Sequence, residues 1–154
     1  EYADKYVALA KQWSETPTAA LSALEAGELF EKLGDRDRAL EVLLQASEQA
    51  PAESPIRAVA ASRIGSLHEE KGDFEAAARA HEAAAAVPGS ALSAESLAQA
   101  ARCWAEAGNS DLALALYQRL RTESPDRKLA PHIEARLQEI EARSGSSPAP
   151  TAAP

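Results

Sequence analysis

The chain has 154 residues, a formal net charge of −8 and a single cysteine. The negative charge counts against nucleic acids and anionic membranes as partners, because proteins bind both through clustered Lys and Arg side chains. One cysteine rules out an intrachain disulfide, and the sequence holds no apolar run of the roughly 20 residues that a membrane-spanning helix needs.

The first expected element is an amphipathic helix over residues 2–13, which ends before Pro17. Its apolar stripe, at helical spacing, comprises Tyr2, Tyr6, Leu9 and Trp13. We expect this stripe to pack against the hairpin that follows. The helix lacks a partner helix of its own, so the alternative is that Tyr2, Tyr6 and Trp13 form an edge for a second copy of the chain or for another protein.

Three helical hairpins follow, at about residues 18–51, 54–88 and 93–125. Each repeats one unit: a small residue, a bulky residue three positions later, a Gly-Asp or Gly-Asn break, and an alanine-centred apolar pattern. The breaks are Gly34-Asp35, Gly72-Asp73 and Gly108-Asn109. In each break the glycine ends the first helix, and the Asp or Asn can cap the second. This recurrence predicts an all-α stack of hairpins.

A last helix is expected over residues 131–143, with an apolar stripe made of Ile133, Leu137 and Ile140. It would act as a cap, because the last hairpin would otherwise expose its apolar face. Residues 144–154 consist mainly of Ser, Pro, Ala and Thr, which predicts a disordered tail. We therefore expect one helical repeat domain over residues 1–143.

The repeated unit resembles the tetratricopeptide repeat (TPR), a helix–turn–helix unit of about 34 residues. The first hairpin matches the TPR pattern throughout, at Gly27, Phe30, Ala39, Ala46 and Pro51. The third matches at Ala101, Trp104, Ala113 and Pro125. The second keeps Gly65, Ala77 and Ala84, but has His68 at the aromatic position and Gly89 in place of the closing proline. The resemblance implies a TPR-type α-solenoid of three hairpins, with an extra N-terminal helix and a C-terminal capping helix.

The proline-containing links at residues 53–55 and 125–131 resemble those in TPR domains of bacterial envelope proteins. Examples are the ancillary subunit of the Sec translocon and the cell-division coordinator linked to the Tol-Pal system. The resemblance implies a bacterial envelope protein on the periplasmic side, with a cytoplasmic protein as the alternative. The chain has no methionine and begins with Glu1, which we interpret as a piece processed or excised from a longer protein.

Close helix crossings are expected where small residues of the two helices in a hairpin face each other. The expected pairs are Gly27 with Ala39, Gly65 with Ala77, and Ala101 with Ala113. Leucine in place of the small residue should overpack the crossing. Gly65→Ala is expected to be neutral or stabilising, because alanine has the higher helix propensity.

No motif in the sequence indicates catalysis, a cofactor or a bound metal, so we expect a non-enzymatic protein. Three histidines occur, at His68, His81 and His132. We expect His68 to lie near Phe74 and His81 near Ala61, about two helical turns apart, which is too far for one metal ion. Cys103 is expected to be a small buried packing residue.

The resemblance implies a protein partner that lies in a concave groove formed by the first helix of each hairpin. The expected groove residues are Leu24, Glu28, Glu31, Ser62, Ser66, Glu69, Ala98, Arg102 and Glu106. Their acidity favours a peptide or helix that carries Lys or Arg. Two alternatives stay open: these residues only keep the groove soluble, or the chain is a self-assembly module that forms homo-oligomers through residues 2–13.

Overall fold

The computed structural model describes residues 1–14, 16–125 and 131–145, and each regular element in these ranges is an α-helix. The helices are α1 (Tyr2–Gln12), α2 (Pro17–Lys32), α3 (Arg36–Gln49), α4 (Pro55–Glu70), α5 (Phe74–Ala85), α6 (Ser93–Glu106), α7 (Ser110–Glu123) and α8 (Pro131–Gly145). Helices α2/α3, α4/α5 and α6/α7 form three hairpins in the predicted ranges. The all-α prediction is confirmed.

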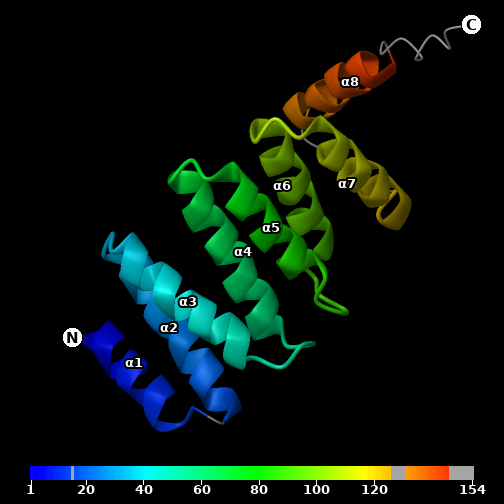
Figure 1. The fold of residues 1–154 in the computed structure, drawn as a ribbon. Coiled ribbons are helices and arrows are strands. Elements are labelled where there is room, and N and C mark those ends of the chain that lie inside the picture. Colours follow the sequence, from blue (N-terminus) through cyan, green and yellow to red (C-terminus); the bar gives the residue numbers. More distant parts are fainter. Residues whose placement is uncertain (15, 126–130, 146–154) are drawn as a thin grey trace, which may run out of the picture.

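Figure 1 shows the helices stacked in chain order, with α1 at one end and α8 at the other. Each helix packs against the next one along the chain, and α2 also contacts α4. The apolar surface of each hairpin is therefore buried against its neighbours rather than in one central core. No helix in the described ranges combines the length and the apolar character that crossing a membrane requires.

The break inside each hairpin is a tight turn, as the sequence predicts. The turn glycines have positive φ angles of 76°, 76° and 83° at Gly34, Gly72 and Gly108. This left-handed conformation carries little penalty for glycine. The side chain of the next residue then accepts a hydrogen bond from a backbone N–H in the first turn of the second helix, at Asp35, Asp73 and Asn109. The same local chemistry thus ends one helix and begins the next.

Helix α1 packs on α2 through its small residues, with Ala3 and Ala10 buried and Val7 partly buried. The aromatic stripe lies on the outside, with exposed fractions of 73% for Tyr2, 37% for Tyr6, 36% for Leu9 and 50% for Trp13. The expectation that the stripe packs against the first hairpin is therefore wrong. Ala3 and Ala10 have the spacing of Ala39 and Ala46 in α3, so α1 takes the position of the second helix of a hairpin.

The close crossings pair a small residue with a large one. A Cβ atom on Gly27 would lie 2.6 Å from Cγ of Leu43, and a Cβ atom on Gly65 would lie 2.6 Å from Cε1 and Nε2 of His81. The glycines thus face Leu43 and His81, four positions beyond the alanines that we expected. In the third hairpin, Ala101 shares a buried cluster with Tyr117, which again lies four positions beyond Ala113.

Helix α8 covers the end of the stack. Ile140 is buried in a cluster with Trp104 and Ala113, which agrees with its predicted role in the cap. The helix continues to Gly145, two residues past the predicted end. The side chains of His132, Ile133 and Leu137 lie outside the described part of the chain, as do residues 146–154, so the tail stays a prediction.

Candidate functional site

Ion pairs connect the first helices of the three hairpins to one another. Arg63 on α4 pairs with both Glu28 and Glu31 on α2, at 3.2 Å from Nη2 to the Glu28 carboxylate. Arg102 on α6 pairs with Glu69 on α4. The surface that results is called the A-helix face here and comprises Glu28, Glu31, Ser62, Arg63, Ser66, Glu69, Arg102 and Glu106.

A hollow of about 360 Å³ lies at the edge of this face, lined by residues of α2, α3 and α4. Its lining is Glu31, Arg36, Arg63, Ser66, Leu67 and Glu70. Arg36 and Glu70 form an ion pair across it. A polar lining of this kind suits a polar side chain or a peptide backbone better than an apolar ligand, because apolar ligands bind in mostly hydrophobic pockets.

The structure removes one residue from the expected groove, because Ala98 is buried in a cluster with Leu97 and Leu120. Leu24 is half-buried and packs in part against the first core cluster. Of the others, Ser66 and Glu106 are exposed, while the remaining expected residues are half-buried, namely Glu28, Glu31, Ser62, Glu69 and Arg102.

The acidic side chains of the A-helix face already have basic neighbours. Glu28 accepts a hydrogen bond from Lys32 at 2.7 Å and also faces Arg63. The bond from Lys32 and the charge of Arg63 lower the pKa of Glu28. With Glu31 on Arg63 and Glu69 on Arg102, the charges alternate along the face. The face is therefore less acidic than its carboxylates alone suggested.

Glu69 is the centre of a largely buried polar group that joins α4, α5 and α6. One carboxylate oxygen, Oε2, accepts a hydrogen bond from Arg102, and the other, Oε1, lies 2.8 Å from Nε2 of His81. Burial raises the pKa of Glu69, but the hydrogen bonds from Arg102 and His81 outweigh it and keep the pKa below its ordinary value. Because an ionised carboxylate only accepts hydrogen bonds, His81 carries its proton on Nε2.

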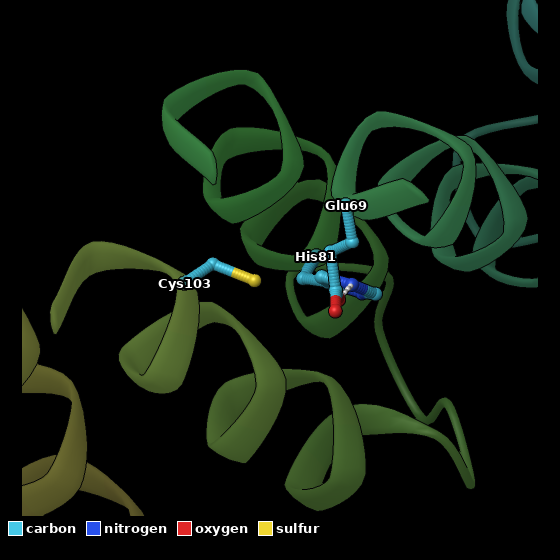
Figure 2. Close-up of side chains that lie close together, drawn as sticks. All are labelled: Glu69, His81 and Cys103. Atoms are coloured by element: carbon cyan, nitrogen blue, oxygen red, sulfur yellow. Dashed lines mark hydrogen bonds and ion pairs between the residues drawn. The ribbon is translucent and has the colours of Figure 1, made fainter. Parts of the chain in front are cut away.

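Cys103 completes this group, as Figure 2 shows. One possible ligand atom each from Glu69, His81 and Cys103 lies within 4.8 Å of the other two. His81 and Cys103 are almost fully buried, with 2% and 0% of their surface exposed. Burial lowers the pKa of His81, while burial and the charge of Glu69 raise the pKa of the Cys103 thiol to about 12. In this structure, both are therefore neutral near pH 7.

The comparisons with known proteins agree with this architecture. Residues 20–55 and residues 95–127 each match a family model described as tetratricopeptide repeat. The chain carries tetratricopeptide repeats. The two TPR matches fall on the first and third hairpins, and the matching hairpin architecture of α4 and α5 places a repeat of the same kind between them.

Several solved structures are similar in fold. MamA superposes with a TM-score of 0.66 at 17% identity, covering 93% of this chain and 77% of the MamA chain. A Podosopora anserina putative kinesin light chain with nearly identical TPR-like repeats superposes with a TM-score of 0.65 at 16% identity, covering 94% of this chain and 86% of the other. BtubC (BKLC) from P. vanneervenii superposes with a TM-score of 0.62 at 20% identity, covering 99% of this chain and 60% of the BtubC chain. No curated protein sequence matches the chain significantly.

Arg63 is the residue of the A-helix face that the sequence prediction missed. It follows Glu28 and Glu31 at about one repeat length, so the spacing was a usable signal. Arg102 was expected in the groove, and its pairing with Glu69 has a similar spacing. The contact between Glu69 and His81 had no such signal. It depends on His81 lying against Gly65, where we had expected it beside Ala61.

Proposed function

We propose that this TPR domain is a non-enzymatic protein–protein interaction module. Its partner would be an extended segment or a helix of another protein that lies across the A-helix face. The observation that supports this proposal is the set of ion pairs from α2 to α4 to α6, which joins side chains of three repeats into one polar surface. Repeat proteins use extended surfaces of this kind for binding.

The charges of the face bear on the partner. A partner that carries Lys or Arg would meet Glu28, Glu31 and Glu69, but each of these carboxylates already has an arginine neighbour. Such a partner must exchange one ion pair for another, and the gain from net charge is small. We therefore propose that hydrogen bonds in the hollow at Ser66 contribute more to affinity, while charge sets orientation and association rate.

A direct test selects peptides from a random library on the immobilised protein and measures their affinity for two variants. Ser66→Arg fills the hollow of the A-helix face, and Ala115→Arg adds the same side chain at an exposed site on α7. We expect Ser66→Arg to weaken binding at least about tenfold and Ala115→Arg to change it little. Equal effects of both variants, or a loss confined to Ala115→Arg, would place the binding site elsewhere.

A second candidate function, self-assembly, has one specific observation in its favour: the exposed stripe on α1. In an antiparallel pair of α1 helices, setting Tyr6 against Leu9 of the second copy also sets Tyr2 against Trp13. Aromatic and aliphatic groups then match under two-fold symmetry. Four side chains on one helix bury less surface than the roughly 1,200–2,000 Å² of a standard interface. We therefore propose a weak dimer whose formation depends on protein concentration.

Sedimentation equilibrium over a range of protein concentrations tests this second candidate. The variant is Tyr6→Ser with Trp13→Ser, and the matched control is Leu112→Ser, which changes a comparably exposed apolar side chain on α7. We expect dimerisation to disappear in the first variant and to persist in the second. A wild-type protein that stays monomeric at high concentration would exclude self-assembly and leave the stripe to a different protein.

We also propose that the parent protein acts in a bacterial cell envelope, on the periplasmic side. The support is the likeness of the links at residues 53–55 and 125–131 to those of envelope TPR proteins. Cell fractionation of the native organism with an antibody against this domain tests the proposal. Recovery with periplasmic or envelope markers supports it, and recovery with cytoplasmic markers overturns it in favour of the cytoplasmic alternative.

A further inference from the structure

The two junctions between TPR units share one architecture but differ in side chains. The first junction consists of Glu31, Leu43 and Leu67. The equivalent positions of the second junction are Glu69, His81 and Cys103. Leu43 and Leu67 are buried together in one apolar cluster. The repeat architecture therefore works with leucine at both positions, and it does not require the histidine and the cysteine of the second junction.

Three consecutive helices supply the side chains of the second junction: α4 carries Glu69, α5 carries His81 and α6 carries Cys103. Their ligand atoms lie within 4.8 Å of one another. In a tetrahedral zinc site, bond lengths of about 2.0–2.3 Å place neighbouring ligand atoms roughly 3.4–3.8 Å apart. Side-chain rotations that bring the atoms closer by about 1 Å convert one arrangement into the other.

We propose that the second junction binds a Zn²⁺ ion through the Glu69 carboxylate, an imidazole nitrogen of His81 and the Cys103 sulfur. Thiolate, imidazole and carboxylate are the three ligand types that zinc takes from proteins. On binding, the Cys103 thiol releases its proton to solvent, and His81 binds as a neutral imidazole. A water molecule completes the tetrahedron, as in zinc sites with three protein ligands.

The junction supplies negative charge for a divalent ion. The Glu69 carboxylate and a Cys103 thiolate together match the two positive charges of zinc, and the guanidinium of Arg102 adds one positive charge beside Glu69. Arg102 holds one oxygen of Glu69, which leaves the oxygen beside His81 for the metal. Hydrogen-bonded carboxylates of this kind are common around protein metal sites, because the outer contact orients the ligand.

Burial and access also agree with a bound ion. Nδ1 of His81 is buried and has no hydrogen-bond partner in the described part of the chain, so the polar group is incompletely satisfied by protein atoms. His81 and Cys103 are shielded from solvent, while the Glu69 side chain is 21% exposed. The ion can therefore enter from the A-helix face beside Glu69 and then lie in a site closed on its other sides.

The test uses the full chain, stripped of metal with a chelator and kept reduced. Competition with a chromophoric chelator measures Zn²⁺ affinity, and Co²⁺ reports the ligands, because a cobalt–thiolate bond absorbs in the near ultraviolet. We expect a single equivalent of metal, a cobalt–thiolate band, and a rise in melting temperature with Zn²⁺. Absence of the cobalt–thiolate band in the wild-type protein overturns the proposal, whatever the variants do.

Two variants and one control test the assignment of the ligands. Cys103→Ser removes the sulfur with little change in size. The double variant His81→Leu with Cys103→Leu copies the first junction, so we expect it to fold and to bind no zinc there. The control is His68→Ala. His68 is adjacent to Glu69 in sequence but is not part of the group of possible metal ligands. We expect the ligand variants to lose more affinity than the roughly 10–100-fold loss that follows when a residue hydrogen-bonded to a metal ligand is changed, and the control to lose none. Zinc affinity that survives in the double variant places the metal elsewhere and overturns the proposal.

Discussion

The imidazole of His81 lies against Gly65 so closely that a Cβ atom on the glycine would come within 2.6 Å of the ring. The contact fixes the separation of α4 and α5, and it brings Nε2 of His81 to the carboxylate of Glu69. One crossing therefore determines both the packing of the second repeat and the position of its buried polar group.

Gly65→Ala and Gly27→Ala should each destabilise the domain, although alanine is the better helix former. The added methyl group would overlap His81 or Leu43, both of which are buried, and overpacking of this kind costs about 1–3 kcal/mol. Ser66→Ala, at an exposed site on α4, is the matched control and should be neutral. Chemical denaturation of the metal-free proteins measures the effect. Alanine variants as stable as the wild type would show that the helices separate easily.

Removing the charge of Glu69 should destabilise the domain more than removing that of Glu28. Glu69→Gln weakens hydrogen bonds to Arg102 and His81, and bonds to charged groups contribute about 1.5–3 kcal/mol each. Glu28→Gln should leave the stability nearly unchanged, because ion pairs that are in contact with solvent contribute little. Denaturation of the metal-free variants with urea measures both. If the two changes have the same effect, Glu69 is not the centre of a coupled group.

The capping side chain of Asp73 should contribute about 0.5–2 kcal/mol, the usual range for a helix N-cap. Asp73→Ala removes the acceptor of the backbone N–H of Ala76, whereas Asp73→Ser retains an oxygen that can accept the same bond. We expect the alanine variant to be destabilised and the serine variant to recover most of the loss. Thermal unfolding followed by circular dichroism gives the comparison, and equal melting temperatures for both variants would argue against the cap.

Asp4 should titrate at low pH in the folded protein. The hydrogen bond from Arg38, together with the amine of Glu1, lowers the pKa of Asp4 from 3.8 to about 2. A carboxyl with a lowered pKa stabilises the folded state above the unfolded value, and this contribution is lost as the pH falls through the folded value. The affected window therefore runs from about pH 4 down to about pH 2.

Arg38→Gln should raise the pKa of Asp4 toward 3.8 and remove this part of the pH dependence. Carboxyl resonances followed by NMR during a pH titration give the pKa directly. Arg36→Gln is the matched control, because Arg36 pairs with Glu70 on a different surface. A pKa near 2 that persists in the Arg38 variant would mean that other groups hold the carboxylate ionised.

Local signals predicted the helices well, because glycine conformation and side-chain capping act over a few residues. Gly72 and Asp73 are enough to end α4 and begin α5. The orientation of α1 could not be predicted in this way. Helical periodicity shows that Tyr6 and Trp13 share a side of the helix, but it does not show which side has a neighbour. The small side chains of Ala3 and Ala10 decided the contact, because they allow the closer approach.

The buried polar group was missed for a different reason. Glu69, His81 and Cys103 lie on three helices, and they meet only if His81 faces Gly65. We had expected His81 to contact Ala61, which is one helical turn away from Gly65 on α4. In that arrangement the three side chains would lie apart. The repeat pattern identifies which helices cross, while the sizes of the side chains at the crossing set the register.

Because the two junctions carry different side chains, the repeats fit together only in their native order. A duplicated second repeat would set Glu69 and His81 of the first copy against Ser66 and Leu67 of the next, in place of Arg102 and Cys103. The carboxylate would lose its arginine, and the imidazole would face leucine. Units of this chain therefore cannot be exchanged freely, as the modules of a consensus-designed array can. Each unit is matched to its own neighbour, and unequal recombination within the gene would be selected against at the second junction first.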